Sequence, residues 1–349
     1  MRGRATSTAR LAAAALVGAS LATCAAARPA AAAARPAGSV SVLDHGAKGD
    51  GVTDDTAALR RAAATGRPLW FPTPAAYYRI TGTIELRNSI YGQRRPELRM
   101  DPGVQDGGAD NDTANGTVML LVRSYQGPGM VIDSIHLNGS WNHVPLGRYD
   151  AGQPAAPQWS HGIRIMGPSR NVTVRNCWIE NNGGDNIAIT WYRPEAGPPR
   201  NIEIVGNKLQ WPWRCNVFFN AGAGVVIQGN YCEDLLDGSA QGYPGNFQGL
   251  IQIETDYDYH TVAGVTIRDN VLNASRSWGG MGAVTLSNVH AGATGGVTVS
   301  GNRGVWSEVA PSIAWPGDAA GLVGRAGTWT ASTVSGNSRD RGAAWSFAP

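Results

Sequence analysis

The sequence predicts an all-β protein: a single right-handed parallel β-helix with a short capping helix near its N-terminus. Three observations predict this fold class. The 349 residues include 46 glycines and 20 prolines but only 16% charged residues, a composition that favours short strands and many turns. A segment of alternating β-branched residues that ends in a polar pair recurs along the chain. A second segment with the same alternation follows these polar pairs.

Residues 1–27 are typical of a secretory signal peptide. The basic start "MRGRATSTAR" precedes the short apolar stretch "LAAAALVGASLA" and a run of small residues. That stretch is too short to span a bilayer, and no later stretch is long enough, so we expect a secreted protein without a membrane span. Lipoprotein anchoring at Cys24 is the lesser alternative, because Thr23 fits a lipoprotein cleavage box poorly. Residues 28–38 are an Ala/Pro linker, and residues 39–349 form the β-helix domain.

The mature chain carries no excess charge. Loss of Arg2, Arg4 and Arg10 with the signal peptide takes the formal net charge from +3 to zero, and Lys48 and Lys208 are the only lysines. A neutral chain has no electrostatic basis for binding nucleic acid or an anionic membrane.

Three cysteines remain after this cleavage, Cys177, Cys215 and Cys232, and an odd count leaves at least one of them unpaired. Cys215 and Cys232 fall on different corners of the predicted coils, so we expect no disulfide and three small buried side chains. No Cys/His spacing matches a zinc site.

A capping helix is predicted over residues 54–65. Thr53 or Asp54 caps the run "TAALRRAAATG", and Gly66 ends it. The segments "RPLWFP" and "YYRITGTIEL" that follow are the first strands.

The repeat begins in the middle of the chain. Its copies are "NVTVRNCWI", "NIEIVGNKL", "GVVIQGNYC", "GVTIRDNVL" and "GVTVSGNRG", with "STVSGNSRD" as a truncated copy. Each coil leaves an apolar face that only a neighbouring coil can bury, so the copies must stack. The aligned asparagines tolerate left-handed backbone at a bend and can hydrogen-bond along the column. A β-sandwich is the alternative, but its Asn-Gly hairpin signals do not recur. The column contains Asn207, Asn230, Asn270, Asn302 and Asn337, with Cys177 in the same place.

The second apolar segment reads "HGIRI", "DNIAI", "CNVFF", "GLIQI" and "GAVTL" in successive coils. Alternation predicts one set of side chains inside, Ile163, Ile187, Val217 and Ile251, and a second set outside on one lateral face, Arg164, Ala188, Phe218 and Gln252. A third column, His161, Asp185, Cys215 and Gly249, marks the strand entrances.

The segment from Val42 to Leu86, beginning "VLDHGAKGDGVTDD", resembles the N-terminal cap of the secreted pectin-lyase-like β-helix superfamily, most of all its polygalacturonase-related members. The residues that carry the resemblance are Asp44, Gly46, Ala47, Gly49, Asp50, Gly51, Asp54 and Asp55. The resemblance implies the fold. It says less about function, because lyases, hydrolases, epimerases and phage tailspikes share this cap.

The resemblance also implies where catalytic carboxylates would lie. Polygalacturonase-type hydrolases carry an Asn-Thr-Asp motif and, one coil later, a Gly-Asp-Asp motif at the strand entrances. "GGDNIAI" resembles the second motif, with Asp185 in place of its second Asp and Gly184 in place of its first. His161 stands where the first motif has its Asp, Cys215 replaces a later His, and "LIQIE" replaces Arg-Ile-Lys.

These positions define the predicted site. We expect Asp185 to be a general acid or base, with His161 one coil away, about 4.8 Å, beside it. Asp237 or Asp150, on long entrance loops, is the expected second carboxylate. Glu254 lies roughly 19 Å from Asp185 at standard strand rise and is not its direct partner. The alternative for Asp185 is a structural bend residue.

Aromatic residues in the loops around this face suit the flat, amphipathic faces of sugars. The loop residues concerned are Trp141, Trp159, Trp191, Tyr192, Tyr243, Tyr257 and Tyr259. The predicted substrate-binding residues are Arg164, Trp191, Tyr192, Asn216, Gln252 and Glu254. For Glu254, Asp256 and Asp258 a solvated loop or a calcium site built from oxygen ligands is preferred to catalysis. No metal site and no cofactor are predicted.

The sequence therefore predicts an exported, monomeric protein that acts on a polysaccharide or oligosaccharide, with glycoside hydrolysis preferred because the partly matching motif is hydrolytic. Two alternatives remain. A polysaccharide lyase would need an Arg, Lys or Tyr base, for which Arg164 is a candidate. A non-catalytic glycan-binding or structural β-helix would account for the incomplete motif.

Overall fold

The computed structural model describes residues 34–104, 118–140, 159–192, 194–233, 249–274, 283–288, 294–306 and 333–339. All of them belong to one compact unit, Ala32–Ala348. The predicted second carboxylates Asp150 and Asp237 lie outside the described residues, as do Trp141 and Tyr243. No helix in the described part of the chain is long and apolar enough to cross a membrane.

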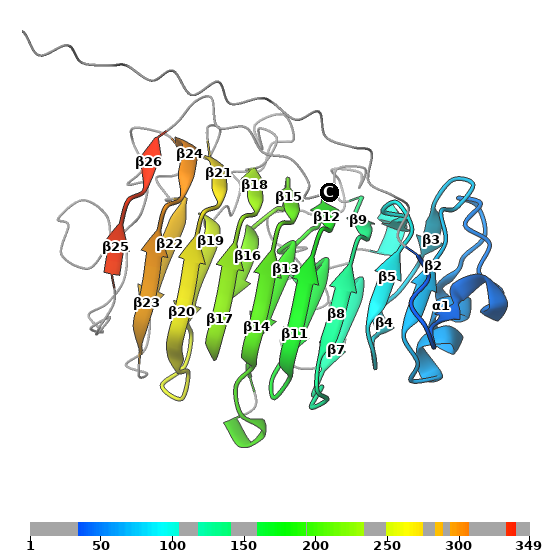
Figure 1. Ribbon diagram of the computed structural model, residues 1–349, viewed down its shortest axis with the longest axis horizontal. Helices are drawn as coiled ribbons and strands as arrows, with labels where there is room; N and C mark the ends of the chain where they lie inside the picture. Colours follow the sequence, from blue (N-terminus) through cyan, green and yellow to red (C-terminus); the bar gives the residue numbers. More distant parts are fainter. Residues whose placement is uncertain are drawn as a thin grey trace, which may run out of the picture. The chain divides into compact units, whose positions relative to one another are not determined.

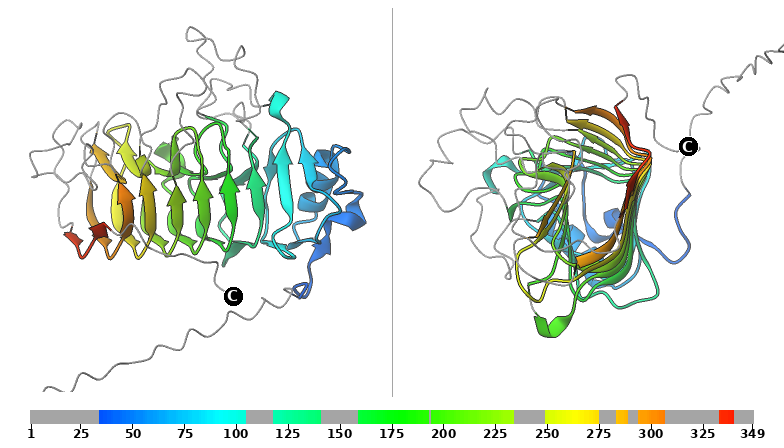
Figure 2. Two further views of the ribbon diagram at one scale, coloured as in Figure 1. Left: turned by 90° about the horizontal axis from the view of Figure 1, so that it is seen from above. Right: turned by 90° about the vertical axis from the view of Figure 1, so that its left-hand side faces the viewer.

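The described strands wind into a coil whose successive turns stack as three sheets, and each described strand pairs in parallel with its neighbours (Figures 1 and 2). The predicted right-handed parallel β-helix is confirmed. Sheet A contains β1 (Val40–Ser41), β2 (Leu69–Phe71), β5 (Ile90–Gly92), β8 (Met130–Asp133), β11 (Arg170–Arg175), β14 (Arg200–Val205), β17 (Gly222–Gln228), β20 (Val262–Arg268), β23 (Thr294–Ser300) and β25 (Thr333–Ser335).

The other two sheets complete each coil. Sheet B contains β3 (Tyr78–Ile80), β6 (Glu97–Met100), β9 (His136–Asn138), β12 (Trp178–Glu180), β15 (Lys208–Gln210), β18 (Tyr231–Glu233), β21 (Val271–Ala274), β24 (Arg303–Trp306) and β26 (Ser338–Arg339). Sheet C contains β4 (Ile84–Glu85), β7 (Leu120–Arg123), β10 (Ile163–Met166), β13 (Ile187–Thr190), β16 (Cys215–Phe219), β19 (Gly249–Thr255) and β22 (Val284–Asn288). Within the described residues, the 3-10 helices are η1 (Val42–His45), η2 (Pro102–Val104) and η6 (Pro194–Ala196).

The predicted cap is confirmed as α1 (Thr56–Ala64), which lies at the end of the coil next to β2 and β3 (Figure 1). The helix begins two residues later than predicted, and its N-cap position is Asp55 and not Thr53 or Asp54. Asp54 accepts a hydrogen bond from the backbone N–H of Thr56 at 3.0 Å. The carboxylate of Asp55 instead accepts from the N–H groups of Lys48 and Gly49, at 2.6 and 3.0 Å, and so ties the preceding turn to the helix.

The interior is filled by the inward side chains of all three sheets, and the predicted inside set, Ile163, Ile187, Val217 and Ile251, belongs to this core. The predicted outside set is aligned across sheet C, since Arg164 pairs with Ala188, Ala188 with Phe218 and Phe218 with Gln252. These outward side chains are nevertheless buried. The outward side chains at these four positions of β10, β13, β16 and β19 are therefore covered from solvent.

The asparagine column forms a continuous hydrogen-bonded ladder. The side-chain oxygen of Asn230 accepts from the backbone N–H of Asn207 at 2.9 Å and from its side-chain amide at 3.0 Å. Asn270, Asn302 and Asn337 repeat this arrangement, and the N–H of Cys177 donates to Asn207 at the start of the ladder. The predicted column is confirmed. The ladder fixes the stacking of six successive coils.

One detail of that prediction was wrong. The left-handed backbone lies at the residue before each ladder position, because it is this residue that turns the chain through the corner. The φ values are +55° at Asn176, +64° at Gly206, +64° at Gly229, +57° at Asp269 and +64° at Gly301.

The three corners of the coil differ in length. From β8 onward, two residues join each strand of sheet A to the next strand of sheet B, as Asn176 and Cys177 join β11 to β12. The segments from sheet B to sheet C vary from 81–83 to 139–162, and those from sheet C to sheet A vary from 220–221 to 191–199. Sheet C is thus flanked by variable segments at both edges.

The described cysteines, Cys177, Cys215 and Cys232, are free and buried, so the prediction of no disulfide is confirmed for them. Cys215 is more than a small apolar filler, since its thiol donates to the side-chain oxygen of Gln252 at 3.1 Å.

Candidate active site

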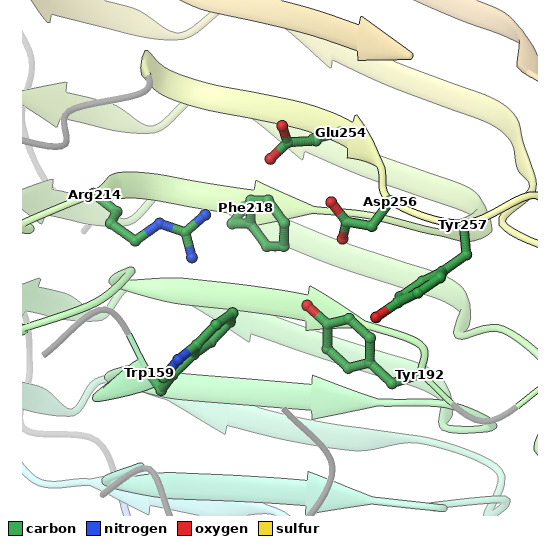
Figure 3. A pocket seen from close by; sticks show the side chains of 7 residues that line it. All are labelled: Trp159, Tyr192, Arg214, Phe218, Glu254, Asp256 and Tyr257. Carbon is green, nitrogen blue, oxygen red and sulfur yellow. The ribbon is translucent and has the colours of Figure 1, made fainter. Parts of the chain in front are cut away.

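A pocket of about 230 Å³ opens on sheet C and combines two carboxylates, a guanidinium and four aromatic rings (Figure 3). Phe218 and Glu254 come from β16 and β19, and Arg214 lies directly before β16. The remaining residues lie in the variable segments at the two edges of the sheet. The pocket is lined by Trp159, Tyr192, Arg214, Phe218, Glu254, Asp256 and Tyr257.

The two carboxylates, Glu254 and Asp256, lie two residues apart, so the strand period turns both toward the same side (Figure 3). At standard strand rise their Cα atoms are about 6.6 Å apart. Burial, and then the negative charge of Asp256, raise the pKa of Glu254 from 4.5 to about 7, although Arg214 opposes this. Glu254 therefore keeps its proton through mildly acidic pH.

Asp256 is held by a closed set of hydrogen bonds. Its carboxylate accepts from the Asn220 amide at 3.2 Å, and its backbone N–H donates to Nδ1 of His260 at 3.0 Å. Nε2 of His260 then donates to the carbonyl of Trp191 at 2.6 Å, and the Trp191 N–H donates to Asn220 at 2.9 Å. Asn220 and His260 are fully buried, so this ring of contacts fixes Asp256 at the pocket edge.

Arg214 forms the opposite side of the pocket, across from the carboxylates (Figure 3). Its guanidinium carbon lies 4.9 Å from the centre of the Phe218 ring and 5.7 Å from that of Trp159, and Nη1 is 3.7 Å from Oδ2 of Asp185. Burial opposes its charge, but the carboxylates around it, Asp185 first, raise the pKa of Arg214 above its usual value. It therefore stays a cation and a hydrogen-bond donor.

The aromatic residues surround the space between the charged groups. The rings of Tyr192 and Tyr257 meet edge to face, 6.2 Å apart between centres. Burial raises the pKa of the Tyr192 phenol, so that its hydroxyl is a donor at physiological pH. Trp159 completes the wall on the Arg214 side. Flat apolar faces beside hydroxyl and charged groups match the two surfaces of a sugar ring.

Asp185 and His161 lie beneath the pocket and do not line it. Both are buried, and they are paired as predicted for neighbours in one column: the Asp185 N–H donates to Nδ1 of His161 at 3.0 Å, and Oδ2 lies 3.2 Å from the same nitrogen. Burial lowers the pKa of His161, which is therefore neutral. Asp185 Oδ1 accepts from the N–H of Cys215 at 3.1 Å, which joins the next coil to this one.

The predicted substrate-binding residues separate into two groups. Tyr192 and Glu254 line the pocket, whereas Arg164, Trp191, Asn216 and Gln252 do not. Gln252 donates to Glu254 at 3.1 Å and so contacts the site from behind. Asn216 is buried in a second amide chain, accepting from Asn186 at 2.7 Å and donating to the carbonyl of Glu233 at 2.8 Å.

Sequence reasoning did not single out Arg214, Asn220 or His260. Arg214 precedes Cys215, the position at which the motif has a histidine, and its role depends on the stacking of three coils. Asn220 and His260 meet Asp256 only because the segment after β19 turns back on itself. The one available signal was the pair Glu254 and Asp256, whose spacing places two acids on one side of a strand.

The described residues contain no group of three or more His, Cys, Asp or Glu side chains that would hold a metal ion. Asp258, considered above as a calcium ligand together with Glu254 and Asp256, is exposed on the turn after β19.

No protein family profile and no curated protein sequence matches the chain. Among solved structures, it is similar to the pre-mature bacteriophage phi29 gene product 12, at 18% identity and a TM-score of 0.51, over 76% of this chain and 34% of that one. The enzymatically active domain of bacteriophage CBA120 tailspike protein 2 matches at 13% identity and a TM-score of 0.47, over 87% and 43%.

The Agl-KA catalytic domain matches at 17% identity and a TM-score of 0.43, over 80% of this chain and 56% of that one. The chain thus spans between a third and just over half of these proteins. The likeness is one of fold, and it agrees with the right-handed β-helix that the pectin-lyase-like cap implied.

Proposed function

We propose that this protein is an exported glycoside hydrolase, acting on a polysaccharide or oligosaccharide that enters the pocket on sheet C. The observation that carries the proposal is the pair of carboxylates within an aromatic pocket, one of which holds its proton up to a pH of about 7. Glycoside hydrolysis needs one protonated and one ionised carboxyl group at close range.

Glu254 is the proposed general acid. It donates its proton to the glycosidic oxygen as the bond to the anomeric carbon breaks, so that the leaving sugar departs with a neutral hydroxyl group. Its raised pKa suits this role, because a carboxyl group with an ordinary pKa would have lost its proton well below neutrality.

Asp256 is the proposed second carboxylate. Its negative charge stabilises the positive charge that develops on the sugar ring, and it acts either as nucleophile or as the base that activates water. The hydrogen bonds from Asn220 and from its own backbone to His260 hold it in place for this step. Trp159, Tyr192 and Tyr257 position the sugar, and Arg214 donates hydrogen bonds to its oxygens.

Hydrolysis is preferred to β-elimination because the pocket offers no suitable base for the latter among its described residues. A lyase needs an unprotonated Arg, Lys or Tyr to remove a proton from carbon. The pKa values of Arg214 and Tyr192 are both raised, so both side chains keep their protons.

A panel of neutral and acidic polysaccharides tests the proposal, with reducing ends and the ultraviolet absorbance of unsaturated products measured together. Wild-type protein should release reducing ends without the absorbance. Glu254→Gln and Asp256→Asn should each lower kcat by at least about a hundredfold, the usual scale for loss of an acid–base group. Asp258→Asn, which removes an exposed carboxylate from the same turn, is the matched control and should retain full activity.

Unsaturated products would show that the protein is a lyase that cleaves by β-elimination. Full activity in Glu254→Gln would show that Glu254 is not the general acid. If no member of the panel yields a product, the protein is a glycan-binding protein without this activity.

A further inference from the structure

Two hydrogen bonds in series connect Cys215, Gln252 and the proposed general acid Glu254. The thiol of Cys215 donates to Oε1 of Gln252 at 3.1 Å, and Nε2 of Gln252 donates to Oε2 of Glu254 at 3.1 Å. Gln252 precedes Glu254 by two residues on β19, so both side chains leave the strand on the same side. Glu254 lines the pocket, whereas Cys215 and Gln252 do not. We call this arrangement the hydrogen-bond chain.

The hydrogen-bond chain is closed to solvent and anchored at its start. Cys215 is fully buried and Gln252 is only 2% exposed, so water does not compete for their polar atoms. The backbone N–H of Cys215 donates to Oδ1 of Asp185 at 3.1 Å, which ties the start of the hydrogen-bond chain to the preceding coil. These contacts hold Gln252 against Glu254 before any substrate binds.

The thiol sets the direction of the hydrogen-bond chain. Burial raises the pKa of the Cys215 thiol well above its usual value, and the charge of Asp185 acts in the same direction. The thiol therefore keeps its proton, and its S–H group donates to the amide oxygen of Gln252 and not to the amide nitrogen. Because the oxygen and nitrogen of an amide lie at opposite ends of the group, the nitrogen then faces Glu254.

This direction decides which oxygen of Glu254 carries the acidic proton. Oε2 accepts from the Gln252 amide, so a proton on Oε2 would place two donors face to face. The proton therefore belongs on Oε1. We propose that Gln252 and Cys215 are positioning residues that keep the acidic proton of Glu254 on Oε1, from which it is transferred to the glycosidic oxygen.

This inference rests on the proposed role of Glu254, but the position of the proton can be measured without substrate. The C=O stretching band of protonated Glu254 is the infrared band that Glu254→Gln removes, and it reports the hydrogen bond to Oε2. At a pH of about 5 Glu254 is protonated. Gln252→Met keeps the length of the side chain and removes the amide, so the band should move to higher frequency. It should not move in Cys232→Ala, which shortens another fully buried cysteine, on sheet B.

Kinetics tests the consequence for catalysis. Gln252→Met should lower kcat about threefold to tenfold, the scale of one lost hydrogen bond, with KM unchanged because Gln252 does not line the pocket. The alkaline limb of the pH profile should move up by about half to one pH unit, because the lost donor stabilised the ionised form of Glu254. The variant leaves in place the charged groups that act on Glu254, which are Asp256, Arg214 and Asp185.

Cys215 offers a matched pair of variants. Cys215→Ala removes the donor, whereas Cys215→Ser keeps a donor in nearly the same place. The kcat of Cys215→Ser should therefore be at least about threefold higher than that of Cys215→Ala. A purely structural role for Cys215 predicts the reverse order, because burying a hydroxyl group costs more than burying a methyl group. The kcat of the control Cys232→Ala should equal that of wild type.

The two measurements separate failure of this inference from failure of the proposed hydrolysis. A band shift in Gln252→Met together with no hydrolysis by wild type would support the position of the proton and overturn the hydrolysis. An unshifted band in Gln252→Met would overturn the inference, because the amide would then be reversed and would accept the proton of Glu254. Unchanged or higher kcat in Gln252→Met would overturn it too, as would a Cys215→Ser variant no more active than Cys215→Ala.

Discussion

Replacing Glu254 with Gln should stabilise the protein at alkaline pH at the same time as it abolishes activity. In the folded protein the pKa of Glu254 is raised from 4.5 to about 7 by burial and by Asp256. The folded state thus holds this proton more tightly than the unfolded chain does. The resulting stabilisation is fully present below pH 4.5 and is lost as the pH rises through about 7.

The two pKa values set the size of the effect. One pH unit corresponds to about 1.4 kcal/mol, so the full difference is about 3 kcal/mol between pH 4 and pH 8.5. Because the pocket is open to solvent, which screens part of the interaction, we expect about 1–3 kcal/mol in practice. Glutamine has the same shape and no charge, so Glu254→Gln avoids this loss altogether.

Urea unfolding of wild type and variant at pH 4 and pH 8.5 measures the effect. The quantity to compare is the variant minus wild-type difference in the free energy of unfolding, since other titrating groups cancel from it. That difference should grow by about 1–3 kcal/mol from pH 4 to pH 8.5. Glu203→Gln, at an exposed position on sheet A, should show no such growth. A change below about 0.5 kcal/mol in Glu254→Gln would refute both the raised pKa and the role of this residue as general acid.

Three further predictions concern the frame around the site. Asn230→Leu leaves several buried ladder groups without partners and should cost about 3–5 kcal/mol, seen as a large fall in the urea midpoint. Asp185→Asn should retain turnover but move the alkaline limb of the pH profile to lower pH, because the Asp185 charge helps to raise the pKa of Glu254. Complete loss of turnover would instead restore Asp185 as the acid or base. The three described cysteines should not react with a thiol reagent in native protein, and all three should react after denaturation without reductant.

The coil could be predicted from the sequence because the residues that specify each coil lie close together in the chain and recur in every repeat. Alternating β-branched residues and the polar pair before each turn occur in every copy, so an error in one copy is corrected by the others. The ladder from Asn207 to Asn337 followed from alignment of the chain with itself. The position of the left-handed residue did not, because both members of each pair tolerate that backbone.

The site could be predicted only in part, because its properties arise between coils. The incomplete motif predicted Asp185 as the acid or base, but Asp185 is buried and does not line the pocket. The raised pKa of Glu254 depends on burial and on the charge of Asp256. The order of residues in the sequence shows neither how deeply Glu254 is buried nor the turn that brings His260 into contact with Asp256. The aromatic residues Tyr192 and Tyr257 were identified because their chemistry alone suggests sugar contact.

The three corners of the coil differ in whether they can accept insertions. The two-residue corner between sheets A and B, with its asparagine ladder, has a single geometry that an insertion would destroy. The corners at the two edges of sheet C hold segments of many lengths without disturbing the stack. Evolution can therefore lengthen or replace the walls of the pocket while the ladder keeps every coil in register. A protein built in this way can acquire a new substrate one segment at a time, without refolding its core.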